Sequence, residues 1–318
     1  MIRPQIAVTL GDPRGVGPEV AREAIDSLDR EGLGASLVVV GPDGILDQHE
    51  PFPMGMAPQP DLDPADADAG SAAARAIEYA VEMALAGEVH AIVTGPVHKP
   101  SLRAAGWDVP GQTEMLAGLT GAERVGMLMA AERTSLGSPL RVLLATTHLA
   151  LRDVPAAVTE TLLVEQTELL AGTLRSDWGI EQPRLALCAF NPHASDGGLF
   201  GTEEASVYAP ALDRLREAGL CVKGPVPADT VFCRALGGEF DAVVVPYHDV
   251  GMAAFKTVAF GSGVNVTIGL PFIRTSPDHG TAFDIAGKGR ADGSSMLEAI
   301  RLATLLANRR FDMGSAHV

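Results

Sequence analysis

Three histidines stand where apolar segments of the sequence end: His148 in ATTHLALRD, His193 in AFNPHASDGG and His248 in VVVPYHDVG. In an open α/β sheet, loops at the carboxyl ends of strands line the ligand crevice. Neutral imidazole is the commonest protein ligand of transition metals. Three such loops could therefore hold one divalent cation and leave a position open for a substrate. A single histidine of this kind is more often a structural residue bonded to backbone, but three in equivalent places favour the metal.

A second polar set lies in the apolar segment AFKTVAFGSGVNVTIGLPFIRTS, which contains Lys256, Asn265 and Arg274. Cations in otherwise buried strands need an anionic partner, because an unpaired buried charge is costly. One phosphate could serve all three residues, with Arg binding it bidentately, Lys as a point charge and Asn as a donor. Salt bridges to Asp or Glu within the protein are the alternative. The segment PGQTEMLAGLTG predicts a helix start with Thr113 in its first turn, where an anion or a simple cap would fit.

Two glycine-rich segments add weaker signals. GDPRGVGPEV follows the first expected strand, but it matches neither G-x-G-x-x-G nor the P-loop pattern, and packing explains such a loop equally well. In TGPVHKPSL, His98 and Lys99 are as consistent with a solvated loop as with a site. The more specific segment is DHGTAFDIAGKGRAD, because a loop so rich in accessible backbone can hold an adenine ring through main-chain hydrogen bonds.

Short β-rich runs alternate along the chain with helical patterns. The strand candidates are nearly continuous apolar runs, such as QIAVTL, HAIVTG, RLALCAF and DAVVVPY, so we expect them to be covered on both faces. This pattern predicts an α/β protein with mostly parallel sheets and helical crossovers. Helices are expected over residues 18–30, 71–86, 155–174, 202–219 and 296–310. Residues 51–70, rich in Pro, Asp and Ala, are interpreted as a surface loop.

Composition bounds the class of protein. A chain of 318 residues usually forms two domains, and 47% hydrophobic with 20% charged residues is typical of a globular enzyme. The net charge of −16 disfavours binding to nucleic acid or to an anionic membrane surface. Three cysteines without a C-x-x-C pattern predict neither disulfides nor structural zinc, and favour the reducing cytoplasm. We find no signal-peptide pattern and no apolar stretch that could span a bilayer.

Taken together, the motifs resemble a known family. GDPRGVGPE, TGPVHK, GQTE, TTHLALRD, NPHASDGGLFGTEE, GPVPADT, YHDVG, GVNVTIGLPFIRTSPDHGTA and AGKGRAD occur in order and look like the 4-hydroxythreonine-4-phosphate dehydrogenase family of pyridoxal phosphate biosynthesis. DHGTAFDIAGKGRAD also resembles the cofactor loop of isopropylmalate and isocitrate dehydrogenases, whose fold this family shares. The resemblance implies a two-domain α/β/α fold, with residues 1–125 and 245–318 in one domain and 126–244 in the other. It also implies an active site in the cleft between the domains and a homodimer with that site at the subunit interface.

The resemblance implies roles for particular residues. Two departures concern the substrate: many members read GHTE where this chain has Gln112, and YHDQG where it has Val250. A divalent metal (Zn²⁺, Co²⁺, Mn²⁺ or Mg²⁺) would be held by His148, His193 and His248, and NAD or NADP would bind near His279, Gly280, Asp284 and Asp229. The substrate contacts would be Gln112, Thr113, Lys256, Asn265 and Arg274, with Asp249 and Lys256 as catalytic candidates.

The implied reaction is oxidation of 4-hydroxythreonine 4-phosphate at C3 by NAD(P), followed by decarboxylation to 3-amino-2-oxopropyl phosphate. Two alternatives remain open. The first is a dehydrogenase of another phosphorylated hydroxy acid, 4-phospho-threonate or 4-phospho-erythronate. The second is a phosphate acyltransferase, which shares the architecture but needs neither the adenine-type loop nor three metal ligands. We expect a small phosphorylated substrate, no nucleic acid and no membrane partner.

Overall fold

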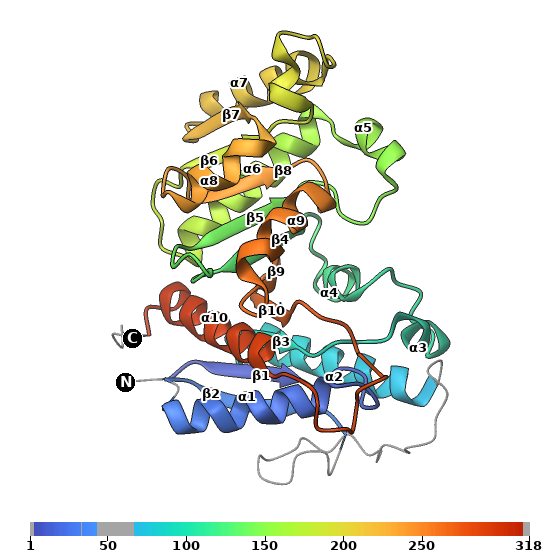
Figure 1. Cartoon of the computed structure of the whole chain (residues 1–318). Helices are drawn as coiled ribbons and strands as arrows, with labels where there is room; N and C mark the ends of the chain where they lie inside the picture. The colour runs from blue at the N-terminus through green and yellow to red at the C-terminus, as the bar shows by residue number, and fades with distance from the viewer. Residues whose placement is uncertain (1–2, 33, 43–66, 314–318) are drawn as a thin grey trace. The chain divides into compact units, whose positions relative to one another are not determined.

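A computed structural model of the chain describes residues 3–32, 34–42 and 67–313. The chain divides into two compact units, the first formed by Met1–Val125 with Leu270–Val318 and the second by Gly126–Gly269 (Figure 1). The expected boundary at residue 125 therefore agrees with the structure, whereas residues 245–269 belong to the second unit. The reason is local: α9 (His248–Ala259) packs on β5 (Leu140–Leu144) and β8 (Ala242–Val245), and β9 (Val264–Ile268) pairs with β4 (Gly126–Ala131).

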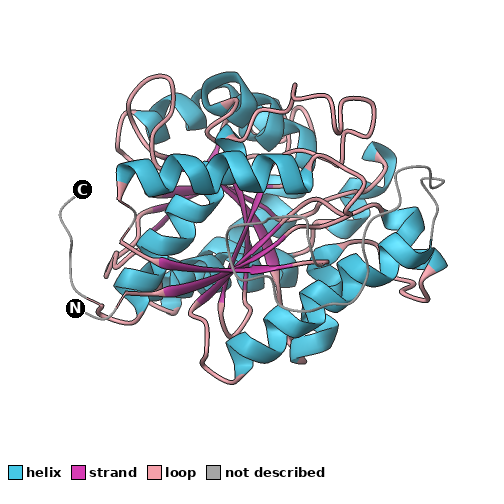
Figure 2. Ribbon diagram, turned by 90° about the horizontal axis from the view of Figure 1, so that it is seen from below, coloured by secondary structure: helices cyan, strands magenta, loops and turns pink. Residues whose placement is uncertain are grey.

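In the first unit the strand order is β2-β1-β3-β10, and each neighbouring pair is parallel. These strands are β1 (Gln5–Thr9), β2 (Ser36–Val40), β3 (Ala91–Thr94) and β10 (Ile273–Pro277). The helices are α1 (Gly17–Glu31), α2 (Ala67–Leu85), α3 (Lys99–Ala104), α4 (Gln112–Thr120) and α10 (Ser294–Arg310). Helix α10 packs along β10, β3 and β1, and α2 packs against β1, β3 and β2. Figure 2 shows helices on both sides of the strands, as continuous apolar strands require.

In the second unit the strand order is β9-β4-β5-β8-β6-β7. The pairs β5–β8, β8–β6 and β6–β7 are parallel, and β4 is antiparallel to both of its neighbours. The strands not yet bounded are β6 (Leu185–Cys188) and β7 (Val222–Val226). The helical segments are η1 (Leu151–Asp153), α5 (Val154–Ala157), α6 (Glu160–Ser176), η2 (Pro192–Asp196), η3 (Glu204–Tyr208), α7 (Ala209–Glu217) and α8 (Ala228–Leu236). The predicted α/β fold with mostly parallel sheets is confirmed.

Two expected helices differ from the structure in instructive ways. The helix expected over 155–174 is broken, because Thr159 caps α6 by accepting a hydrogen bond from the backbone N–H of Leu162 at 3.2 Å. The helix expected over 202–219 begins with the π-helical turn η3 before α7 continues it. Of the expected surface loop 51–70, residues 51–66 lie outside the described residues. Residues 67–70 form the start of α2.

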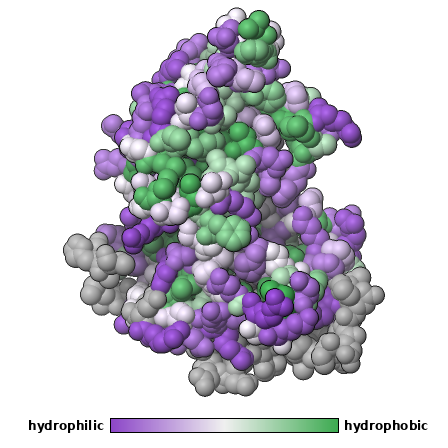
Figure 3. Space-filling view, viewed as in Figure 1, coloured by the Kyte–Doolittle hydropathy of each residue, from purple (hydrophilic) through white to green (hydrophobic). Residues whose placement is uncertain are grey.

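Each unit has its own apolar core. In the first, Ile77, Leu116 and Phe272 belong to one buried cluster, and in the second Val243 and Phe255 belong to another. Cys188 is fully buried at the end of β6, and burial raises the pKa of its thiol to about 12. Figure 3 shows apolar surface interspersed with polar surface over the second unit. Within the described ranges, no helix has the length and apolar character that crossing a bilayer requires.

Candidate active site

The three strands that precede the histidines are neighbours. Strands β5, β8 and β6 lie side by side and run parallel, so their carboxyl ends share one edge of the sheet. His148 follows β5, His248 follows β8 as the first residue of α9, and His193 follows β6 in η2. The expectation that each histidine closes a strand is confirmed. Parallel pairing then explains how residues far apart in sequence come to one edge.

Two of these imidazoles lie together. The ring centroids of His148 and His248 are 5.5 Å apart, with the rings tilted by 45°. They line a pocket of about 220 Å³ together with Thr147, Tyr247 and Asp249. The donor chemistry of this pocket fits a transition-metal cation, because neutral imidazole nitrogens are its preferred ligands.

Asp249 determines which nitrogen of His248 can bind a ligand. Its Oδ1 lies 2.8 Å from Nδ1 of His248. A carboxylate oxygen accepts hydrogen bonds, so this contact favours the neutral tautomer with the proton on Nδ1 and the lone pair on Nε2. A carboxylate on the second nitrogen is the usual way in which a metal-binding histidine is oriented.

His193 stands in a different local setting. It belongs to a turn with left-handed backbone, at φ 52°, and its Nδ1 lies 4.0 Å from Oδ2 of Asp229. Asp229 is the second residue of α8, so the predicted cofactor contact lies beside a predicted metal ligand. Among the described residues of this single chain, no group of three or more His, Cys, Asp or Glu side chains is arranged to hold a metal. The structure thus brings two of the predicted ligands together, and the third stays a prediction.

The guanidinium of Arg274 is the centre of a buried polar cluster in the first unit. Arg274, in β10, is 3% exposed and donates from Nη2 to Oγ1 of Thr94 at 2.6 Å and to Oε1 of Gln112 at 2.5 Å. Oγ1 of Thr94 also donates to Oε1 of Gln112 at 2.5 Å, and Nε2 of Gln112 donates to the carbonyl of Gly95 at 2.8 Å. These bonds fix the orientation of Gln112 and of the guanidinium beside Thr94, the last residue of β3.

Burial lowers the pKa of Arg274 to about 10, although the charge of Glu114 opposes this effect. The guanidinium is therefore still charged near neutral pH. Its hydrogen bonds to Thr94 and Gln112 go to neutral oxygens and fix the orientation of the cation. A fixed cation of this kind suits a substrate phosphate, which accepts the parallel donors of Arg. Sequence reasoning missed Thr94, although its place at the end of an apolar run was a usable signal.

Two further predicted substrate residues, Thr113 and Lys256, lie in helices. Thr113 lies in the first turn of α4, as predicted, although the N-cap residue is Gly111. Lys256 is not in a buried strand: it is an exposed residue of α9, because Met252, Phe255 and Ala259 give this segment a helical apolar face.

Asn265 is in a strand, β9. Its Oδ1 has no accessible surface and no hydrogen-bond partner within the part of the chain that the structure describes. Buried polar atoms are nearly always paired, so an orphaned acceptor at a predicted substrate contact is consistent with a missing ligand. Lys256 and Asn265 belong to the second unit, whereas Arg274, Gln112 and Thr113 belong to the first.

Three of the four predicted cofactor residues, His279, Gly280 and Asp284, lie in the loop between β10 and α10, over residues 278–293. The carbonyl of Thr281 accepts from the backbone N–H of Val16 at 2.9 Å. Carboxylates of α1 also bind the loop: Glu23 accepts from the backbone N–H of Gly293 at 2.9 Å, and Glu19 accepts from that of Gly287. Helix α1 therefore holds the loop in place.

Three predicted cofactor contacts can be placed within this loop. Gly280 and Asp284 are exposed. The ring of His279 is partly buried, and its Nε2 has no accessible surface and no partner among the residues described. An orphaned ring nitrogen beside accessible backbone fits a ligand with hydrogen-bonding groups, such as an adenine nucleotide.

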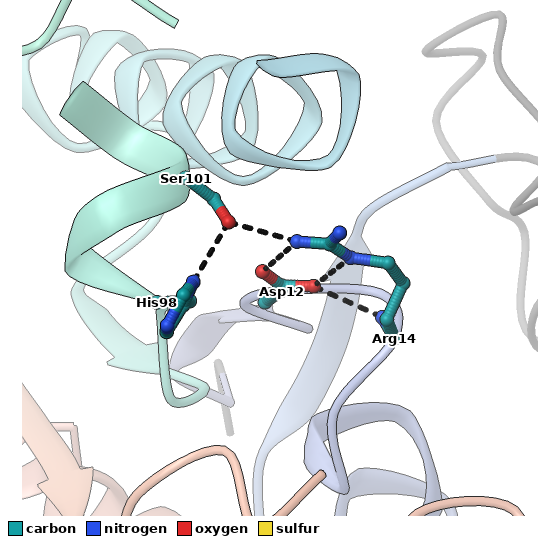
Figure 4. A network of polar contacts seen from close by, with 4 residues as sticks. All are labelled: Asp12, Arg14, His98 and Ser101. Carbon is teal, nitrogen blue, oxygen red and sulfur yellow. Dashed lines mark hydrogen bonds and ion pairs between the residues drawn. The ribbon is translucent and has the colours of Figure 1, made fainter. Parts of the chain in front are cut away.

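A polar network that the sequence did not reveal lies beside this loop (Figure 4). Asp12, fully buried, accepts from Nε of Arg14 at 3.1 Å and from Nη2 at 2.9 Å. Nη2 of Arg14 also donates to Oγ of Ser101 at 2.8 Å, which lies 2.8 Å from Nδ1 of His98. The guanidinium of Arg14 lies over the ring of Phe283, 5.7 Å from its centroid, and His98 meets the same ring edge-on. His98 is thus part of a structured network rather than a solvated loop.

Imidazoles after the carboxyl ends of parallel strands in the second unit, and a guanidinium fixed beside the last residue of β3 in the first, define a protein of the class that binds small ligands at such strand ends. The family described as pyridoxal phosphate biosynthetic protein PdxA matches residues 44–303, and the chain belongs to that family. The family resemblance seen in the motifs is therefore confirmed.

Individual relatives agree with the family. A 4-hydroxythreonine-4-phosphate dehydrogenase from Paracoccus denitrificans (strain Pd 1222) is 42% identical over 324 residues, which cover 96% of this chain and 98% of the relative. The crystal structure of a 4-hydroxythreonine-4-phosphate dehydrogenase from Burkholderia phymatum is similar at a TM-score of 0.82 and 40% identity, covering 96% of this chain and 99% of that one. Isocitrate dehydrogenase from Methylococcus capsulatus, at 15% identity and a TM-score of 0.54, shares the fold.

Proposed function

We propose that this protein oxidises 4-hydroxythreonine 4-phosphate at C3 with NAD or NADP, and that decarboxylation then gives 3-amino-2-oxopropyl phosphate. The observation that carries the proposal is the buried, charged Arg274, which Thr94 and Gln112 orient. The chain is also 42% identical to a relative named 4-hydroxythreonine-4-phosphate dehydrogenase. Arg274, Gln112 and Thr113 bind the phosphate, together with Lys256 and Asn265. Anchoring this group places the reacting carbon, which is how binding energy is converted into rate.

We further propose a divalent cation (Zn²⁺, Co²⁺, Mn²⁺ or Mg²⁺) bound by His148, His193 and His248. The support is the imidazole pair in its pocket and the carboxylate of Asp249 on Nδ1 of His248. When bound, such a cation acts as a Lewis acid that lowers the pKa of the substrate hydroxyl. Asp249 favours the His248 tautomer whose lone pair is on Nε2, and Lys256, two turns further along α9, supplies a cationic donor towards the substrate.

The cofactor is assigned to the loop containing His279, Gly280 and Asp284, with Asp229 as a further contact. The support is the orphaned Nε2 of His279 and the way in which α1 holds the loop. In this arrangement the protein positions the nicotinamide and the substrate, while the redox chemistry belongs to the cofactor.

We also propose a homodimer with the active site at its interface, and the surface around the histidines supports this proposal. The turns that carry His148 and His193 expose large apolar side chains: Leu149 at 48%, Leu151 at 66%, Leu199 at 71% and Phe200 at 46%. Apolar side chains grouped beside a polar site favour an interface between subunits. The exposed thiols of Cys221 and Cys233 favour a reducing compartment, so we assign the protein to the cytoplasm.

The proposal is tested by following reduction of NAD and NADP with a panel of phosphorylated hydroxy acids and added divalent cations. The panel contains 4-hydroxythreonine 4-phosphate, 4-phospho-threonate and 4-phospho-erythronate. We expect the first to give the highest kcat/KM and to release carbon dioxide. If one of the other two is preferred, the proposed site chemistry stands and only the substrate changes. This comparison matters because the neutral Gln112 lies beside Arg274. Absence of nucleotide reduction with all three would reject the proposal.

A further inference from the structure

The turn that carries His193 has an unusual backbone. His193, Ala194, Ser195 and Asp196 are consecutive non-glycine residues with φ values of 52°, 54°, 69° and 43°. An L-residue in this left-handed region brings Cβ too close to the following carbonyl, so each one carries a conformational cost. Such a run persists only where surrounding contacts hold it, and strained backbone of this kind gathers at functional sites.

The group that holds the turn is the carboxylate of Glu204, the first residue of η3. Its Oε1 accepts from the backbone N–H of Phe190 at 3.0 Å and from that of Asn191 at 2.6 Å. Its Oε2 accepts from Nδ2 of Asn191 at 2.9 Å and from the hydroxyl of Ser195. The four donors come from residues on both sides of His193, so one buried anion holds the turn at its start and near its end.

The electrostatics agree with a fixed, ionised carboxylate. Glu204 is 7% exposed, which by itself would raise its pKa, but the hydrogen bonds from Asn191 and Ser195 outweigh burial and the pKa lies below its ordinary value. Since an ionised carboxylate offers about four acceptor sites, these donors use its capacity fully.

We propose that Glu204 is a positioning residue for His193: it holds the left-handed turn in which His193 presents its imidazole as a metal ligand. The inference rests on the proposed function, because it assumes that His193 binds the cation. Among the described residues, no hydrogen bond or ion pair joins Glu204 to His193 itself. It acts through the backbone of Asn191 and through Ser195, which set the direction of the Cα–Cβ bond of His193. Without the Glu204 carboxylate, the turn would relax to ordinary backbone angles. The imidazole of His193 would then point in a different direction and bind the metal less well.

The test is metal binding by the full-length, chelator-treated protein, with Co²⁺ alone as the probe. The substitution Glu204→Gln keeps the side-chain size but offers one acceptor oxygen, and its amide NH₂ then faces donors. We expect the dissociation constant for Co²⁺ to rise by about 10- to 100-fold, the range typical when a group that orients a metal ligand is removed. Ser195→Ala removes one of the four bonds and should weaken binding less, so it tests the same idea if the first variant does not fold.

Two controls separate positioning from general stability. Val164→Ala removes a methyl pair from the core side of α6, where Val164 is 3% exposed, and should lower the melting temperature without changing Co²⁺ affinity. The double variant Glu204→Gln with His193→Ala should bind Co²⁺ as His193→Ala alone does, because Glu204 acts through His193. Additive losses in the double variant would overturn the inference.

The outcomes also distinguish this inference from the function on which it rests. If His193→Ala leaves Co²⁺ affinity unchanged, the metal assignment fails and the inference fails with it. If His193→Ala weakens binding and Glu204→Gln does not, the metal assignment stands and the positioning role alone is wrong. The visible absorption spectrum of bound Co²⁺ gives a second readout, since loss of an imidazole ligand changes its coordination.

Discussion

The substitution Arg274→Lys tests the phosphate site most directly. Lysine keeps a positive charge at this position in β10 but loses the planar fork that lets arginine donate two parallel hydrogen bonds to a phosphate. In the structure, Nη2 and Nε of Arg274 both donate to Oγ1 of Thr94, at 2.6 and 3.2 Å, so the plane of the guanidinium is fixed before substrate binds, and the donors for a phosphate come from the rest of the group. The ammonium of lysine is a single donor atom, so Thr94 would not fix its orientation in the same way. It would have to reorient when the substrate binds.

The expected magnitude follows from the bonds that are lost. A hydrogen bond to a charged group contributes about 1.5 kcal/mol or more, so losing two costs about 3 kcal/mol. Since each 1.36 kcal/mol is tenfold, kcat/KM for the phosphorylated substrate should fall by about 100-fold. KM for the nucleotide should stay within about twofold of the parent value, because the cofactor does not use this fork.

The assay is steady-state reduction of the nucleotide by the parent and by Arg274→Lys, with 4-hydroxythreonine 4-phosphate and with the same compound lacking its phosphate. With the unphosphorylated compound the two proteins should be equally poor. Arg141→Lys is the matched control: Arg141 is also buried and donates bidentately from Nη2 to Glu132 at 2.7 and 2.8 Å, so it should lower stability and leave kcat/KM unchanged. Equal losses for both compounds, or equal rises in both KM values, would refute the phosphate assignment.

Four further outcomes are expected. Gln112→Ala removes an acceptor from Nη2 of Arg274 and should raise KM for the phosphorylated substrate about 10-fold, measured by steady-state kinetics, with no change in nucleotide KM. Gly251→Ala should lower the free energy of unfolding by about 1–3 kcal/mol in denaturant titration, because its Cβ would come 2.8 Å from a Val245 methyl. Arg14→Ala should raise nucleotide KM several-fold in the same assay while substrate KM stays constant, since the network of Figure 4 supports the cofactor loop. Treatment with a chelator should abolish nucleotide reduction and leave far-ultraviolet circular dichroism intact; full activity after metal removal would contradict the catalytic cation.

Burial of Arg274 also predicts a pH dependence. Its pKa is lowered to about 10, so the cation is present below that pH and is lost as the pH rises through it. KM for the phosphorylated substrate should therefore be flat at neutral and mildly alkaline pH and should rise near pH 10. A rise that begins near neutrality would point to a different group as the phosphate-binding cation.

Local pattern was sufficient for most of the strands and for the places of the histidines, but not for β7, where Gly224 and Pro225 interrupt the apolar run. An apolar run followed by Gly, Asp or Pro identifies a buried strand and its end, which is why His148, His193 and His248 were found directly after β5, β6 and β8. The same reasoning failed for Lys256. The apolar residues around Lys256 recur at helical rather than alternating spacing. Unless that spacing is counted, a short apolar segment does not show whether it forms a buried strand or a helix.

The sequence by itself determined the elements, their order and the family, because these depend on short-range periodicity and on motifs that are contiguous in the chain. Only the tertiary structure decided which distant groups meet. Arg274 finds Gln112 across 162 positions and Thr94 across 180, and the adjacency of β5, β8 and β6 brings His148 beside His248. Such pairings depend on strand order and on hydrogen bonds that close only when the sheets assemble, so no local pattern encodes them.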